Sequence, residues 1–225
     1  MRVSGVLLAA GASSRFGSPK MLAPVGENRK PLLQKVCETW LEAGVDDLLI
    51  VLGCDAADIR VRLEENLLRR KNTEEDLLRK VRRDESATTL VRFVENPNWE
   101  AGMFSSVKTG LAATAADSTH IAISPADLPF LSKESLRTVL SAAASLDAGG
   151  SSLVVPTHAG RRGHPLLIPA ALRERLLSWP DSARLNQLFE EPDVTVHCLE
   201  GFDETILRDV DTPSDLLKPH SCLSR

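Results

Sequence analysis

Cysteine is scarce in this 225-residue chain, and its placement excludes two common uses of the residue. The four cysteines, Cys37, Cys54, Cys198 and Cys222, are widely scattered. None belongs to a Cys-x-x-Cys pair, and no histidine lies at a spacing typical of zinc sites. We therefore expect reduced, mainly structural thiols rather than a disulfide framework or a zinc centre.

Long apolar runs and an excess of positive charge are also lacking. No segment approaches the length of a membrane span, and Gly5 breaks the apolar N-terminal segment, which does not fit a signal peptide. A formal net charge of -4 gives no general attraction to nucleic acid or to an anionic membrane. We therefore expect a cytoplasmic protein with no nucleic-acid or membrane partner, in which particular arginines and lysines hold any anionic ligand.

The two best-known phosphate-binding loops are missing as well, because the sequence has no G-x-x-x-x-G-K-[ST] and no G-x-G-x-x-G. Another glycine-serine loop is present, in VLLAAGASSRFGSPK. It follows Val3–Ala9, an apolar run too continuous for a half-exposed strand, which predicts a central strand covered on both faces. Gly11 should then let the backbone turn sharply and let a ligand approach closely.

The loop carries groups that suit phosphate. Ser13 and Ser14 offer hydroxyls and backbone N–H groups. Arg15 adds a planar guanidinium and Lys20 a mobile ammonium. An ordinary strand-to-loop connection with surface cations would have the same composition, so the loop alone leaves both interpretations open.

The rest of the chain alternates apolar strands with helices, which predicts an α/β fold with a mostly parallel, doubly wound sheet in a single domain, residues 1–225. Helix Pro31–Ala43 before strand Asp47–Gly53 implies a parallel pair with a right-handed crossover. Further strands are predicted at Thr89–Val94, His120–Ser124 and Ile206–Val210. Further helices are predicted at Gly102–Ala115, from Ser132 with that residue as N-cap, at Pro169–Leu177 and at Ser214–Leu217.

Residues 57–88 form a charged insertion. Its composition predicts one or two solvated helices over Ala57–Glu85. The basic run 69–71 could mark a partner site, but interleaved acidic residues favour a solvated face. We assign it no chemistry.

One acidic residue is expected at the sheet edge where ligands of doubly wound sheets bind. Asp127 follows the predicted strand His120–Ser124, within SPADLPF. Magnesium uses one or two carboxylates plus substrate phosphates, so Asp127 could be a ligand. It could equally cap the turn that Pro125 and Pro129 enforce.

A second acidic segment, LRDVDTPSDL, should reach the same edge. Asp209 and Asp211 alternate along a predicted strand end and should therefore point to opposite faces. Asp211 or Thr212 is expected to cap the last helix. Asp209 then remains as a second metal ligand.

Two further segments carry polar groups. In AGRRGHPLLIP, strands Leu153–Val155 and Pro165–Ile168 predict a small β-hairpin whose turn presents Arg162 and His164 beside Gly163, either as surface residues or as an anion-binding loop. In NPNWEAGMFSSVKTGL, the serines 105 and 106 could cap a helix or read the polar edge of a base.

Together these five segments, in this order, resemble the molybdenum cofactor nucleotidyltransferases, and most closely their cytidylyltransferase branch. The resemblance spans nearly the whole chain and rests on LAAGASSRFGSPK, NPNWEAGMFSSV, PADLP, RGHP and DVDTP. The guanylyltransferase branch usually has a second glycine in the first motif, where this chain has Ala10. The resemblance therefore implies a Rossmann-like nucleotidyltransferase fold and CTP rather than GTP.

The resemblance also implies roles for individual residues, with Mg²⁺ as the cofactor. Catalysis would fall to Arg15, Lys20 and Asp127. Asp127 and Asp209 would bind the metal. Arg162, Gly163 and His164 would lie near the pterin-bearing substrate. The nucleotide would contact Ala9, Ala10, Gly11, Ser13, Ser14, Arg15, Lys20, Gly102 and Ser106.

The expected reaction is magnesium-dependent transfer of CMP from CTP to the phosphate of molybdopterin or the molybdenum cofactor, with release of pyrophosphate. One alternative is a guanylyltransferase, or another transferase that acts on a sugar phosphate or an isoprenoid-precursor phosphate. A second alternative is a non-catalytic accessory protein that passes the cofactor to a molybdoenzyme. Retention of the acidic pair with Arg15 and Lys20 favours chemistry over binding alone.

Overall fold

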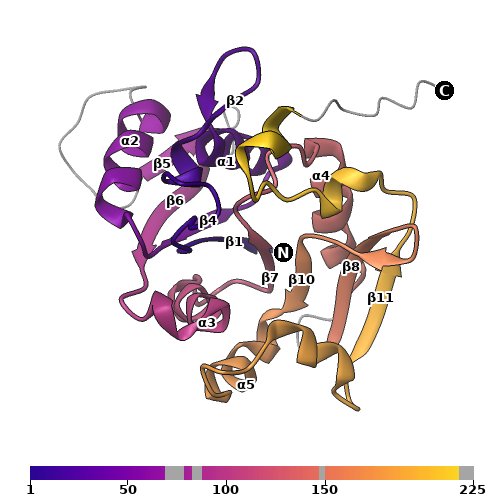
Figure 1. The fold of residues 1–225 in the computed structure, drawn as a ribbon. Coiled ribbons are helices and arrows are strands. Elements are labelled where there is room, and N and C mark those ends of the chain that lie inside the picture. The colour runs from indigo at the N-terminus through magenta and orange to yellow at the C-terminus, as the bar shows by residue number, and fades with distance from the viewer. Residues whose placement is uncertain (69–78, 83–87, 147–149, 218–225) are drawn as a thin grey trace.

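The computed structural model describes residues 1–68, 79–82, 88–146 and 150–217 (Figure 1). Within these ranges, nine strands form one sheet, ordered β11-β8-β10-β7-β1-β4-β6-β5, with β9 paired to β8. Along this order only β10 and β5 run against the others. The strands are β1 Val3–Ala9, β4 Asp47–Leu52, β5 Arg79–Arg82, β6 Thr88–Glu95, β7 His120–Pro125, β8 Ser152–His158, β9 Arg161–Arg162, β10 Leu166–Pro169 and β11 Thr195–Leu199.

Helices cover both faces of this sheet. The helices α1 (Leu32–Ala43), α2 (Ala56–Leu68) and α4 (Lys133–Ala142) pack on one face, and α3 (Met103–Ala113) and α5 (Arg173–Ser178) on the other (Figure 1). Successive residues of the fully buried β4 alternate between the two apolar clusters, as expected for a strand covered on both sides. The predicted mostly parallel, doubly wound α/β fold is confirmed.

The strand order places a ligand site. From β1 the chain moves to β4 and β6 on one side, and it then returns to β7 on the other side of β1. In open α/β sheets, ligands bind beyond the carboxyl ends of the strands at such a switch point. The glycine-serine loop follows β1, and Asp127 follows β7, so both lie at this point.

Several local predictions are confirmed. Ser132 caps α4, because its Oγ accepts a hydrogen bond from the backbone N–H of Ser135 at 3.0 Å. The helix expected to end at Ala43 does so, and Gly44 follows it with a φ of 100°. The strands predicted at 153–155 and 165–168 are β8 and β10, which pair antiparallel within the main sheet. A separate small hairpin pairs β2 (Pro24–Val25) with β3 (Lys30–Pro31).

Two predictions of secondary structure are wrong. Ile206–Val210 is not a strand, because a 3-10 helix spans Glu204–Leu207 and irregular backbone follows it. The apolar pattern of Ile206 and Val210 reflects the full burial of both side chains and not membership of a sheet. Helix was expected through Glu85, but Arg79–Arg82 is strand β5, paired with β6. The parts of that prediction at 69–78 and 83–87 lie outside the described residues.

The strands β5, β9 and β11 were not predicted. The last helix exists as a 3-10 helix, Pro213–Leu217. None of the helices within the described ranges combines the length and the apolar character of a membrane span.

Candidate active site

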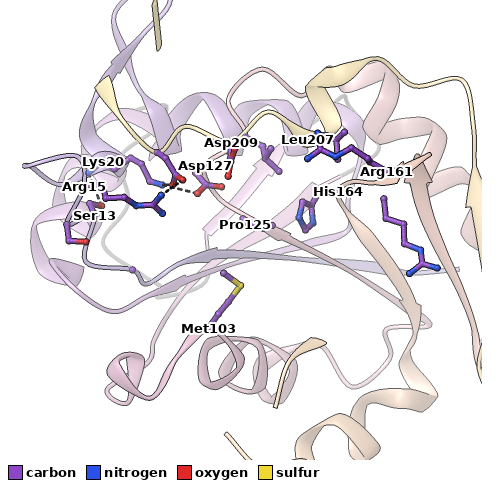
Figure 2. Close-up of a pocket in the computed structure, with 15 residues that line it drawn as sticks. Ser13, Arg15, Lys20, Met103, Pro125, Asp127, Arg161, His164, Leu207 and Asp209 are labelled. Carbon is purple, nitrogen blue, oxygen red and sulfur yellow. Dashed lines mark hydrogen bonds and ion pairs between the residues drawn. The ribbon is translucent and has the colours of Figure 1, made fainter. Parts of the chain in front are cut away.

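Cations of the glycine-serine loop meet carboxylates from two distant segments (Figure 2). Lys20 Nζ lies 2.9 Å from Asp127 Oδ2 and 3.6 Å from Asp211 Oδ1. Arg15 Nη1 lies 2.7 Å from Asp211 Oδ2. Lys20 is nearly buried, with 11% of its side chain exposed, whereas 72% of the Arg15 side chain is exposed. Lys20 is therefore a fixed charge, and Arg15 is free to reorient toward a ligand.

These groups line a first cavity of about 600 Å³ at the switch point. The residues predicted for phosphate, metal and acceptor contribute to it together. Its polar lining includes Ser13, Ser14, Arg15, Lys20, Asp127, Arg161, Arg162, His164, Asp209 and Asp211, with Gly11 beside them.

The chain bends at Gly11 as predicted, and a hydrogen-bonded turn follows from Ser13. Ser13 has a φ of 52°, in the left-handed region, and its carbonyl accepts a hydrogen bond from the Phe16 N–H at 2.8 Å. Ser13 Oγ accepts a second one from the Lys20 N–H at 3.2 Å. Apart from Gly11 and its two chain neighbours, no heavy atom of the described residues lies within 4 Å of where a Gly11 Cβ would stand. The loop is thus shaped by Ser13, while Gly11 keeps space open beside the cavity.

Asp209 and Asp211 do not point to opposite faces as predicted, because both line the first cavity. The period-two rule applies to extended strands, and this segment is not one. Thr212 stands directly before the helix Pro213–Leu217, and Asp215, the third residue of that helix, reaches back to it. The Asp215 carboxylate accepts hydrogen bonds from the backbone N–H groups of Asp211 and Thr212 at 3.1 and 2.7 Å, as the acidic residue of a capping box does. The Asp211 carboxylate is left to face Arg15 and Lys20.

Crowding of carboxylates defines the electrostatics of the first cavity. Burial raises the pKa of Asp209, and the nearby charges of Asp127 and Asp211 raise it further. A bound cation would relieve this repulsion. Among the described residues, no group of three metal-ligating side chains is preassembled. Magnesium needs only one or two carboxylates when substrate phosphates complete its shell, so the hard oxygens of Asp127 and Asp209 fit this ion.

Close packing against a neighbouring segment requires a glycine at position 163. Its N–H donates to the Pro156 carbonyl at 2.8 Å, and the next N–H, of His164, donates to the Ile206 carbonyl at 3.0 Å. A Cβ on Gly163 would stand 2.6 Å from that same Ile206 oxygen. Close contact between the RGHP turn and residue 206 therefore fixes the backbone that leads to Asp209.

We predict that Gly163→Ala lowers turnover although residue 163 would gain only a methyl group. The backbone at Ile206 must move, which shifts Asp209, and misplacing a catalytic group by about 1 Å can cost roughly 100-fold in rate. Overpacking should also cost about 1–3 kcal/mol of stability. Steady-state kinetics and thermal unfolding measure the two effects. Unchanged turnover in a stably folded variant would contradict the positioning role.

The RGHP turn brings two more side chains to the cavity walls. The Arg162 guanidinium lies over the Phe189 ring, 4.4 Å from its centroid. Burial lowers the pKa of His164, although the Asp127 charge acts in the opposite direction. Within the described part of the chain, His164 Nδ1 is buried without a hydrogen-bond partner. His164 thus lines both large cavities with a side chain whose buried environment disfavours the charged form.

The predicted nucleotide side adjoins the first cavity. Ala9, Ala10 and Ser106 line a smaller cavity of about 300 Å³. Ser106 does not cap α3, because its Oγ accepts a hydrogen bond from Asn96 Nδ2 at 3.0 Å. Gly102 occupies the N-cap position with φ of 110°, a conformation that favours glycine.

A second large cavity, of about 690 Å³, shares Met103, Pro125, Arg162 and His164 with the first. Gly102 and Gly163 line this second cavity rather than the first. The remaining lining is mainly apolar and comes from α3, β7, β8, β10 and the segment 181–189.

Sequence reasoning assigned no ligand-binding role to four residues that the fold brings to these sites. They are Asp211, Asn96, Trp99 and Met103. The last three lie inside the NPNWEAGMFSSV motif, which was a usable signal. Asp211 was missed because the segment was taken for a strand.

A doubly wound sheet with cations and carboxylates converging at its switch point defines an α/β protein with a charged ligand site at the strand ends. Residues 5–196 match the model of the MobA-like NTP transferase domain, so the chain belongs to this family and is a nucleotidyltransferase. The resemblance inferred from the five motifs is confirmed at the level of the MobA-like NTP transferase domain, whereas the molybdenum cofactor as substrate and the cytidylyltransferase branch stay predictions.

Solved structures support the fold. The chain resembles Rv0371c from Mycobacterium tuberculosis H37Rv, with 22% identity, a TM-score of 0.69 and 96% of each chain covered. It also resembles a nucleotidyl transferase from Methanothermobacter, with 23% identity, a TM-score of 0.72, and 96% and 94% covered. A structure of Rv0371c in complex with manganese aligns at 22% identity, a TM-score of 0.64 and 96% of each chain. A comparison with curated protein sequences gave no match.

Proposed function

We propose that the protein transfers CMP from CTP to the terminal phosphate of molybdopterin or the molybdenum cofactor, with magnesium and with release of pyrophosphate. The observation that carries the proposal is the meeting of Arg15 and Lys20 with Asp127, Asp209 and Asp211 around one cavity. A nucleotidyltransferase needs both signs of charge there. Cations hold the triphosphate, and carboxylates hold the metal.

In this reaction an oxygen of the acceptor phosphate attacks the α-phosphorus of CTP, and the bond to the bridging oxygen of the leaving pyrophosphate breaks. Nucleophile and leaving group are both anionic, so little proton transfer is needed. The protein must offset the repulsion between like charges and align the attack. Lys20 would stabilise the departing pyrophosphate from a fixed position. The exposed Arg15 side chain would break its ion pair with Asp211 and bind the phosphates instead.

Asp127 and Asp209 would hold the magnesium ion. Bound there, the ion would supply charge neutralisation on the phosphates. The raised pKa of Asp209 supports this assignment, because crowded carboxylates gain from a cation. The manganese complex of the structural neighbour Rv0371c supports a divalent ion in this fold.

The preference for cytidine rests on Ala10, which lines the smaller cavity and has 5% of its surface exposed. Its Cβ occupies space that a glycine would leave open, which favours a pyrimidine over a larger purine. The backbone here is tied to the next strand end, because the Ala10 carbonyl accepts a hydrogen bond from the Cys54 N–H at 3.0 Å. The second cavity, reached past Arg162 and His164, is proposed to take the body of the acceptor.

The decisive test is pyrophosphate release with CTP, GTP, UTP or ATP, each with molybdopterin and magnesium. We expect release with CTP above the other nucleotides. A preference for GTP would indicate a guanylyltransferase. Turnover only with a sugar phosphate or an isoprenoid-precursor phosphate would replace the acceptor. Binding of the cofactor without release from any nucleotide would indicate an accessory protein.

We predict that Arg15→Ala raises the KM for CTP about tenfold, since one charged hydrogen bond to phosphate is lost. Arg60→Ala is the matched control, because Arg60 is an arginine on α2 whose partner is Glu64 at 3.1 Å. Steady-state kinetics with CTP as the varied substrate measures the effect. Equal KM values for the two variants would remove Arg15 from the triphosphate site.

A further inference from the structure

We propose that Lys108 of α3 is a positioning residue for the acceptor, because it fixes the near end of the outer wall of the second cavity. The inference rests on the proposed function, since it concerns the cavity assigned to the acceptor. That wall is the segment 179–190, between α5 and β11. Its members Asp181, Leu185, Asn186 and Phe189 line the cavity.

Two residues of α3 hold one short stretch of this wall. Lys108 Nζ donates hydrogen bonds to the Trp179 carbonyl and to Asp181 Oδ1, each at 2.9 Å. The Trp179 ring stacks on Phe104, with 5.9 Å between centroids and 27° between planes. Phe104 and Lys108 are four residues apart and therefore lie on one face of the helix. Helix α3 thus holds Trp179 by its ring and its carbonyl, and Asp181 by its carboxylate.

The rest of the wall is anchored elsewhere. Leu188 is fully buried in the apolar cluster, and Phe189 lies against the Arg162 guanidinium. Between these anchors and Trp179 the hydrogen bonds are local. The Ala183 N–H donates to the Pro180 carbonyl at 2.9 Å, and the Arg184 N–H donates to Gln187 Oε1 at 2.8 Å. Local turn bonds shape the segment but do not attach it to α3. The Trp179 ring, Ala183 and Leu185 also pack on the apolar cluster that contains Phe104. Lys108 adds the polar attachment that fixes the Trp179 carbonyl and the Asp181 carboxylate at the near end.

The same helix separates the acceptor from the nucleotide. Ser106, two residues before Lys108, lines the smaller cavity and is held by Asn96. Residues two apart on a helix do not share a face. A change at Lys108 should therefore alter the acceptor cavity and leave the nucleotide contacts in place.

The test compares Lys108→Met and Lys108→Arg with the control Lys133→Met, which removes a surface lysine paired with Glu42 at 3.5 Å. In Lys108→Met we expect the KM for molybdopterin to rise about tenfold, with kcat and the KM for CTP changed less than about twofold. Lys108→Arg should restore the acceptor KM, since a guanidinium can donate to both oxygens. Amides 181–187 should exchange faster in Lys108→Met alone.

The outcomes separate two failures. If the wild-type protein releases no pyrophosphate with CTP and molybdopterin, the proposed function is overturned. If it turns over but Lys108→Met keeps the acceptor KM of the wild type, or raises both KM values equally, the positioning role is overturned. Unchanged exchange of amides 181–187 in Lys108→Met would also contradict it.

Discussion

Replacing Asp127 with asparagine is expected to lower kcat about 1000-fold with the fold retained, a loss of the size found when a single charge-stabilising group is removed from an active site. The carboxylate oxygen Oδ2 lies 2.9 Å from Lys20 Nζ and beside Asp209 in the first cavity. Asparagine keeps the shape of the side chain and removes its charge. The variant would therefore bind the proposed divalent ion more weakly, because one of its two charged ligands is lost.

Pyrophosphate release at increasing magnesium concentration measures this effect, and circular dichroism checks the fold. Asp117→Asn is the control, because Asp117 is an exposed aspartate that pairs with Arg2 at 2.9 Å, away from the cavity lining. It should keep the turnover of the wild type. Near-normal magnesium-dependent turnover by Asp127→Asn would falsify the assignment of this residue.

Replacing Arg92 with alanine is expected to destabilise the protein by about 3–5 kcal/mol, the range for removing one partner of a buried ion pair. Asp47 on β4 is fully buried. Its carboxylate accepts hydrogen bonds from Arg92 Nε at 3.1 Å and Nη2 at 2.5 Å, and from Ser4 Oγ at 3.0 Å. Without Arg92, only the neutral Ser4 hydroxyl would remain of these three donors. The buried charge would then be largely uncompensated.

Thermal unfolding measures this loss, because about 1 kcal/mol shifts Tm by roughly 2–4 °C in a chain of this size. Arg175→Ala is a matched control. Arg175 also donates two hydrogen bonds to one carboxylate, from Nη1 and Nη2 to the two Asp193 oxygens at 3.0 and 2.6 Å, but this pair is exposed. Its removal should shift Tm far less. Equal Tm shifts in the two variants would show that the burial of Asp47 does not make the stability of the protein more dependent on Arg92.

Much of the fold followed from the sequence, because the buried strands and amphipathic helices carry strong periodic signals. The pattern in Val3–Ala9 required cover on both faces, and β1 has it. The pattern failed at Ile206 and Val210. Both residues are buried in the apolar cluster on the α1, α2 and α4 face of the sheet although neither lies in a strand, so their hydrophobicity carries no information about backbone shape.

The sequence by itself determined which chemical groups the protein offers: the cations of the loop, Asp127 after its strand, and the ordered motifs that indicate nucleotidyl transfer. Only the tertiary structure decided which of these groups meet. Lys20, Asp127 and Asp211 are far apart in the chain, and the strand order around β1 brings them together. The structure also explains why a glycine stands at position 163, because a side chain there would collide with the Ile206 carbonyl. Distances between segments depend on how the sheet is ordered, and a local pattern in the sequence does not encode that order.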